Sequence, residues 1–202
     1  MTPQPNSISI SLPAWLSGFA RPGAVFPSQE ERMRLVISAS RHNVEEGSGG
    51  PFAAAVFQRD SGVLVSLGVN LVVSGKLSML HAEMVAITLA QQSLGVFDLG
   101  GVGMDGKALP AHELVSSCEP CAMCFGAIHW SGVRQLLTGA AAEDAEAIGF
   151  DEGPKVGRWQ RALEQRNIRV VTGVLRSEAA AVLQEYRCRG GVAYNGRGVP
   201  PR

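Results

Sequence analysis

Two short segments of the sequence carry side chains that bind metal ions and transfer protons. The first segment holds His81 and Glu83, and the second holds Cys121 and Cys124 directly after Pro120. On a helix, residues three apart lie on one face, so the two cysteines can direct both sulfur atoms at a single ion. An imidazole from the first segment completes a set of three ligands.

These three ligands predict a catalytic zinc site with one ion per chain. Zinc prefers thiolate and imidazole ligands, and three protein ligands leave one tetrahedral position for water. Zinc lowers the pKa of a bound water to about 7 from about 15.7. Glu83 can take a proton from that water and later deliver it, provided that His81 precedes the regular helix. A helix that begins at Pro120 also presents free amides whose positive field favours thiolates.

Each motif also has simpler interpretations. A lone Cys-x-x-Cys pair occurs in redox proteins, in structural zinc sites and as two buried small side chains. A structural zinc site needs a fourth ligand, and Cys118 is the nearest candidate in the sequence. Because Cys118 precedes Cys121 by three residues on the strand side, we expect it to pack in the core. We expect Cys188 to be free.

The motif residues are expected to lie where strands pass into helices. Residues 80–94 have a helical pattern, and the apolar stretch 114–117 suits a short buried strand before a helix over 120–130. Residues 133–138 predict another strand. This order of strand, helix and strand predicts parallel pairing in an α/β sheet that helices sandwich.

The rest of the chain predicts a single domain built around these elements. Five prolines make residues 1–27 an extended arm with little regular structure. The remaining predicted segments are a helix from Ser28 to about residue 46 with a capping box, a hairpin over 52–58 and 63–73, a surface loop over 95–111, a strand over 168–174, a helix over 178–186 and a tail over 190–202.

The composition bounds the function of the chain. Its 202 residues suit one compact domain, and 18 basic residues balance 18 acidic ones. Such a balance disfavours nucleic acid as the partner, because binding to phosphate backbones draws on an excess of positive charge. The start lacks the pattern of a secretory signal, and no apolar run reaches the roughly 18 residues that span a bilayer. We therefore expect a cytoplasmic protein without a membrane partner.

With these motifs the chain resembles the cytidine deaminase superfamily and, within it, the small bacterial guanine deaminases. The order H-x-E and then P-C-x-x-C is typical of zinc nucleobase deaminases. The segment IGFDEG over 148–153 points to guanine deaminases, and the resemblance runs over about 51–194. It implies a three-layer α/β/α cytidine deaminase-like fold with a central mixed five-stranded sheet flanked by helices. It also implies a homodimer in which C-terminal segments can be exchanged.

The resemblance assigns roles to individual residues. His81, Cys121 and Cys124 become zinc ligands, Glu83 becomes the proton shuttle, and Glu152 becomes a second acid that faces the base. The substrate-binding residues that it implies are Phe52, Asn70, Ala82, Trp130 and Tyr194, of which Asn70 would bond the purine, Phe52 would stack on it and Tyr194 would cap the site.

The predicted reaction is the hydrolysis of a cyclic amidine carbon–nitrogen bond, which converts free guanine to xanthine and ammonia. Guanine presents N1–H beside its 2-amino group, and a carboxylate such as Glu152 can accept from that edge. Glu152 as a solvated loop acid and Asn70 as an ordinary turn residue are the simpler interpretations. Alternative functions are deamination of adenosine in tRNA or of another base, nucleoside or triazine, and a non-catalytic zinc-binding module.

Overall fold

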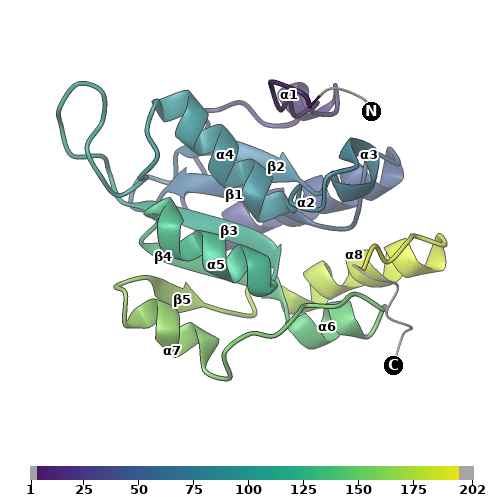
Figure 1. Ribbon diagram of the computed structural model, residues 1–202. Helices are drawn as coiled ribbons and strands as arrows, with labels where there is room; N and C mark the ends of the chain where they lie inside the picture. The colour runs from purple at the N-terminus through teal and green to yellow at the C-terminus, as the bar shows by residue number, and fades with distance from the viewer. Residues whose placement is uncertain (1–3, 196–202) are drawn as a thin grey trace.

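The computed structural model describes residues 4–195 and contains one five-stranded sheet in the order β2-β1-β3-β4-β5. Helices cover both faces of this sheet (Figure 1). The predicted mixed sheet flanked by helices is therefore confirmed. The strands are β1 (Ala53–Gln58), β2 (Leu64–Val69), β3 (His112–Cys118), β4 (Gln135–Ala140) and β5 (Arg169–Val171), and the helices are α1 (Leu16–Phe19), α2 (Gln29–Glu45), α3 (Val72–Gly75), α4 (Ala82–Leu94), α5 (Ala122–Ser131), α6 (Ala142–Glu146), α7 (Trp159–Glu164) and α8 (Arg176–Cys188).

The sheet is mixed because a hairpin precedes a parallel region. β1 pairs antiparallel with β2 and with β3, whereas β3, β4 and β5 run parallel. The hairpin and the parallel later strands were both predicted by the sequence pattern. The connection from β3 to β4 passes through α5, so α5 begins at the carboxyl end of β3. That end of the sheet is where ligands collect in open α/β folds.

Two apolar layers hold the helices on the sheet. Alternation along β1 sends Ala53, Ala55 and Phe57 to one face and Ala54 and Val56 to the other. The first face packs against α2 and α8, and the second packs against α4, α5 and α7. Every residue of β3 and β4 is buried, as expected for strands covered on both faces.

The close packing of α4 on β2 depends on one glycine. A Cβ atom at Gly68 would lie 2.5 Å from the backbone nitrogen of Ala86, which is too short for any side chain to fit. The strand and the helix are therefore in backbone contact at this point. This contact fixes the position of α4 and of the side chains at its N-terminus.

Helix α2 begins as the sequence predicts. The Ser28 side chain accepts from the Glu31 backbone N–H, and the Glu31 carboxylate accepts from the Ser28 backbone N–H, which completes a capping box. Helix α2 then carries Arg32 into the core, where it forms a buried ion pair with Glu113 of β3. Gln135 of β4 donates to the second oxygen of Glu113 at 2.9 Å.

Several predicted boundaries are wrong for local reasons. The second hairpin strand ends at Val69, because Asn70 bonds the N–H of Val72 and starts the short helix α3. Helix α5 begins at Ala122, and Cys121 in extended conformation is its N-cap, so Pro120 is not the first helical residue. The arm contains α1, because Trp15 and Phe19 pack on His42. Residues 196–202 of the predicted tail lie outside the described residues.

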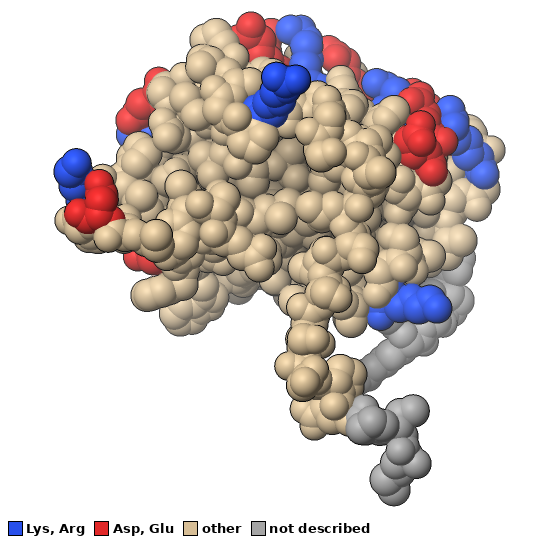
Figure 2. Space-filling view, turned by 90° about the horizontal axis from the view of Figure 1, so that it is seen from above, with Lys and Arg blue, Asp and Glu red and all other residues tan. Residues whose placement is uncertain are grey.

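The surface carries both signs of charge without a large patch of one sign on the face shown in Figure 2, where charged groups gather at the rim. The loop over 95–111 projects from one end of the sheet (Figure 1). An isolated bridge between Val102 and Ala108 is the only regular pairing described within this loop. Across residues 4–195, no helix combines the length and the apolar character needed to cross a bilayer.

Candidate active site

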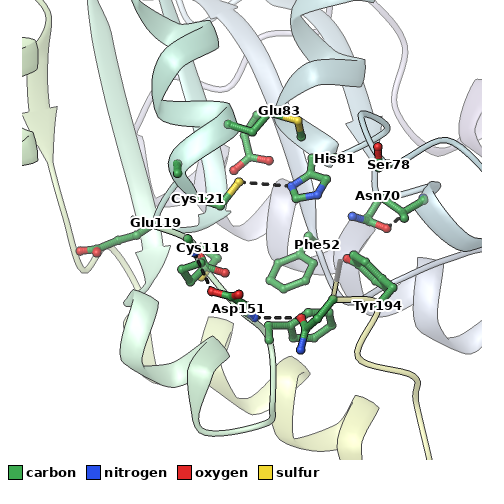
Figure 3. Close-up of a pocket in the computed structure, with 17 residues that line it drawn as sticks. Phe52, Asn70, Ser78, His81, Glu83, Cys118, Glu119, Cys121, Asp151 and Tyr194 are labelled. Carbon is green, nitrogen blue, oxygen red and sulfur yellow. Dashed lines mark hydrogen bonds between the residues drawn. The ribbon is translucent and has the colours of Figure 1, made fainter. Parts of the chain in front are cut away.

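The N-termini of α4 and α5 meet at the carboxyl end of β3. His81 is the N-cap of α4, Cys121 is the N-cap of α5, and Cys124 lies in the first turn of α5. Their ligand atoms all lie within 4.8 Å of one another, and the Cys121 Sγ lies 3.4 Å from the His81 Nδ1 (Figure 3). Within residues 4–195, these three residues are the only group of this kind.

The donor set fits zinc. The hydrogen bond with Cys124 lowers the pKa of the Cys121 thiol to about 4, and the same interaction raises the pKa of Cys124. Burial is the largest single effect on His81 and opposes its charge, but the hydrogen bond with Cys121 and the nearby negative charges together raise the pKa of the imidazole. A divalent ion that binds here displaces the thiol proton of Cys124, because metal ligands must be deprotonated. Two thiolates and one imidazole leave one position of a tetrahedral ion open.

Glu83 lies beside the three metal-binding residues but is not one of them. It is in the first turn of α4 and only 6% exposed. Ser116 Oγ donates to its Oε1 at 3.1 Å, and Cys124 Sγ donates to its Oε2 at 3.4 Å. Burial raises the pKa of the Glu83 carboxyl, and the nearby Cys121 raises it further. An acid with a raised pKa next to a metal site is suited to proton transfer.

A cavity of about 300 Å³ opens in front of these groups. This volume is at the low end of the roughly 300–1,000 Å³ that is typical of small-ligand sites. The aromatic rings of Phe52 and Phe150 form part of its wall and pack edge to face with centroids 5.0 Å apart. Phe52 therefore lies in the cavity wall, where it could stack on a base, and Phe150 is a wall residue that the sequence did not reveal.

Glu152 and Asn70 bring two further polar groups to the cavity. Glu152 is 7% exposed, so it is not the solvated loop acid of the simpler interpretation. Burial raises the pKa of its carboxyl to about 8, and the nearby Cys121 adds to this effect. Asn70 is 1% exposed, and its Oδ1 accepts from Val72 N–H. Its Nδ2 has no hydrogen-bond partner among the described residues, so a donor is left for a ligand.

The C-terminal segment lies over the cavity of its own chain. The Tyr194 ring packs on Phe150 at 5.0 Å between centroids, and its hydroxyl would lie 2.7 Å from a Cβ placed at Gly50. Asn195 Oδ1 accepts from Asp151 N–H at 2.9 Å, and its Nδ2 donates to the Gly149 carbonyl at 2.7 Å. Asn195 thus fastens the segment to the loop that carries Glu152. Sequence reasoning missed Asn195, because its bonds join residues more than 40 positions apart.

Two predicted substrate-binding residues do not line this cavity. Trp130 is 80% exposed near the C-terminal end of α5, so the prediction that it lines the pocket is wrong for the pocket of the described chain. The helix carries it two turns away from Cys121 and Cys124. Ala82 is fully buried, and its side chain packs in the apolar layer between α4 and the sheet rather than on the cavity wall.

The fold and the site together define a zinc-dependent hydrolytic deaminase. Residues 27–140 match the family "Cytidine and deoxycytidylate deaminase zinc-binding region". The chain belongs to this family of zinc-binding deaminases.

The chain is similar to several guanine deaminases. The solved enzyme from Nitrosomonas europaea is 48% identical, with a TM-score of 0.85 and coverage of 93% of this chain and 100% of the other. A structure in complex with 2,6-diaminopurine is 49% identical, with a TM-score of 0.86 and coverage of 95% and 98%. The guanine deaminase of Bacillus subtilis is 30% identical over 141 residues, which are 70% of this chain and 83% of that protein.

Replacing one ligand should release the metal while replacing the nearest other cysteine should not. We expect Cys121→Ser to lower the zinc content from about one ion per chain to a small fraction, because a serine hydroxyl is a poor zinc ligand. Cys118 is buried and donates to the Ala141 carbonyl, so Cys118→Ser is the matched control and should keep its zinc. Elemental analysis of the purified proteins measures both contents. Loss of zinc from the Cys118 variant alone would contradict the assignment.

Proposed function

We propose that the chain is a single-domain guanine deaminase that hydrolyses free guanine to xanthine and ammonia. The observation that carries the proposal is the burial of Glu152 in a small cavity that is also lined by His81, Cys121 and Glu83. The similarity to guanine deaminases supports the same substrate. A small cavity that combines aromatic walls with several polar groups suits a flat, polar heterocycle.

In this proposal His81, Cys121 and Cys124 hold the zinc ion. When bound, zinc acts as a Lewis acid that makes water a nucleophile at neutral pH. The chain's own contribution is to keep the three ligands together at two helix N-termini, where free backbone amides stabilise negative charge. The wall formed by Phe52 and Phe150 excludes bulk water from the reacting atoms.

Glu83 moves the protons in the proposed reaction. It takes a proton from the attacking water and delivers it to a ring nitrogen of the base. It then takes the proton of the newly added hydroxyl and delivers it to the amine, so that the carbon–nitrogen bond breaks, a carbonyl forms and ammonia leaves. Its raised pKa suits both steps, since a carboxyl that titrates closer to neutral pH accepts and donates protons with similar ease.

Glu152 and Asn70 orient the base. A carboxyl oxygen of Glu152 accepts from the N1–H and 2-amino edge of guanine, which adenine and cytosine do not present. The free Nδ2 of Asn70 donates to a ring acceptor on the purine. Phe52 and Tyr194 pack against the faces of the base, and Tyr194 with Asn195 closes the entrance.

Two alternatives fit the site less well. A deaminase that acts on tRNA needs an open site for a flipped nucleotide and a basic surface, whereas this cavity is covered by the C-terminal segment and the charges are balanced. A structural zinc site has no use for a buried, unliganded acid beside the metal, so Glu83 disfavours the non-catalytic module.

We further propose a cytoplasmic homodimer that associates through α5. Met123, Gly126, Ala127 and Trp130 follow one another at helical spacing and form an uncharged stripe whose ends, Met123 and Trp130, are exposed. A large exposed apolar side chain such as Trp130 is typical of interfaces. The tail up to Asn195 contacts its own chain, so the dimer needs no exchange of tails. None of the four cysteines, all of which the structure describes, forms a disulfide, and two of them bind the metal in this proposal, which suits a reducing compartment.

The substrate and the proton shuttle are tested together by measuring ammonia release. The wild-type chain should release ammonia from guanine and much less from adenine, cytosine, their nucleosides or ammeline. Glu83→Gln should keep its zinc and its fold and lose at least about 100-fold in kcat, because the amide cannot carry the proton. Inactivity of the wild type on guanine would refute the substrate, and a fully active Glu83→Gln variant would refute the mechanism.

The role of Glu152 is tested by its removal. Glu152→Ala should lower kcat/KM for guanine by about 10- to 100-fold, as expected when a buried hydrogen-bond partner of the substrate is lost. Glu143→Ala, which removes an exposed acid of α6, is the control and should keep wild-type rates. Steady-state kinetics distinguishes the two variants. Near-normal guanine turnover by Glu152→Ala would remove this residue from the site.

The proposed interface is tested by placing a charge on the α5 stripe. Trp130→Glu should convert the dimer to a monomer in sedimentation velocity, since an unpaired buried carboxylate is costly at an interface. Zinc content should be unchanged, because Trp130 lies outside the metal site. A wild-type chain that sediments as a monomer, or a variant that stays dimeric, would reject this interface.

A further inference from the structure

We propose that Ser116 is a positioning residue that holds the Glu83 carboxylate in its working orientation. This inference rests on the proposed function, because it concerns the proton shuttle of the same reaction. Ser116 is not among the described residues that line the cavity, and its hydroxyl donates to Glu83, through which it acts. Sequence reasoning gave this serine no role.

Ser116 sits at a rigid point of the sheet. It lies in the middle of β3, is 1% exposed, and is paired with Ala54 of β1 on one side and Thr138 of β4 on the other. Side chains alternate along a strand, so Ser116 faces the same side as Leu114, which packs in the layer beneath α4 and α5. A backbone held between two strand partners leaves the hydroxyl little freedom to move.

A hydroxyl at this place needs a specific partner. The layer around it is mainly apolar, and a buried hydroxyl without a hydrogen bond is costly there. The partner is Glu83, whose Oε1 accepts from Ser116 Oγ at 3.1 Å. The Thr138 hydroxyl is also buried and has no hydrogen-bond partner in the described part of the chain. Of the two neighbouring hydroxyls, that of Ser116 is thus the one that is hydrogen-bonded to Glu83.

The bond matters more once the metal site is filled. In the described structure Glu83 accepts from two side chains, Ser116 at Oε1 and Cys124 at Oε2. A cysteine that binds zinc does so as a thiolate, and a thiolate has no hydrogen to donate. Ser116 then remains as the side-chain donor that fixes Oε1, and Oε2 is left free on the side of the metal and the substrate.

Holding the Glu83 carboxylate in place should raise the rate of the chemical step and leave the affinity for the substrate unchanged. Catalytic groups must be held close to their productive geometry by neighbours that are themselves packed in place. If Glu83 rotates, the substrate still binds, because Phe52, Asn70, Glu152 and Tyr194 hold the base. The carboxylate, however, is then aligned for proton transfer in a smaller fraction of the substrate complexes. The expected signature is a lower kcat with little change in KM.

The test compares three variants of the full chain. Ser116→Ala should keep about one zinc ion per chain and lower kcat for guanine by about 10- to 100-fold, with KM within about threefold. Ser116→Thr keeps the hydroxyl beside the small Ala54 and should restore most of the rate. Ser117→Ala is the matched control, because the Ser117 hydroxyl accepts from the Ala53 N–H and, by strand alternation, lies on the opposite face of the sheet from Ser116. It should lower the melting temperature without lowering kcat.

A second readout does not depend on activity. Crystal structures of the zinc-loaded wild type and zinc-loaded Ser116→Ala should show the Glu83 carboxylate turned away from its wild-type orientation in the variant alone, because Cys124 then has no proton to donate. Wild-type kcat in Ser116→Ala, an equally large loss in Ser116→Thr, or an unmoved carboxylate would overturn the proposal. If the wild type does not deaminate guanine, the proposed function fails, whereas the crystal structures still decide the role of Ser116.

Discussion

The approach of two helix N-termini at the end of β3 is the constraint on which the site depends. Helix α4 is held against β2 by backbone contact at Gly68, and α5 is held by its direct connection to β3. His81 and Cys121 are both N-cap residues, so their side chains leave the helices where free amides lie. A shift of either helix along the sheet would separate the imidazole from the two sulfurs and remove the metal site.

The same geometry gathers groups that repel one another. Glu83 and Glu152 are both buried near Cys121. Burial is the largest cause of the raised pKa of each carboxyl, and the negative charge of the Cys121 thiolate is the second. A divalent cation offsets that repulsion at the place where the thiolates converge. The site is therefore built for a metal, and its acids are tuned by the dry surroundings that the apolar layers provide. Stability and chemistry are opposed here, since each buried acid costs free energy that the packed layers must offset.

The sequence predicted the parts of the site that depend on local spacing. His81, Glu83, Cys121 and Cys124 lie within a few residues of one another in two segments, and helical geometry is enough to bring each set onto one ion. The strand and helix order also followed from local patterns. Asn195, Ser116 and Phe150 were not predictable in this way, because their partners are 33 to 46 positions distant or lie across the cavity. Trp130 was misplaced because spacing along α5 does not say which face meets the substrate.

The coordination of the metal by His81, Cys121 and Cys124 can be measured directly by X-ray absorption spectroscopy of the zinc-loaded chain. We expect two sulfur neighbours at about 2.3 Å and two lighter neighbours at about 2.0–2.1 Å, from His81 and from a water in the open position. Four sulfur neighbours, or a single one, would show that these side chains do not share one ion, and would contradict the assignment of the three ligands.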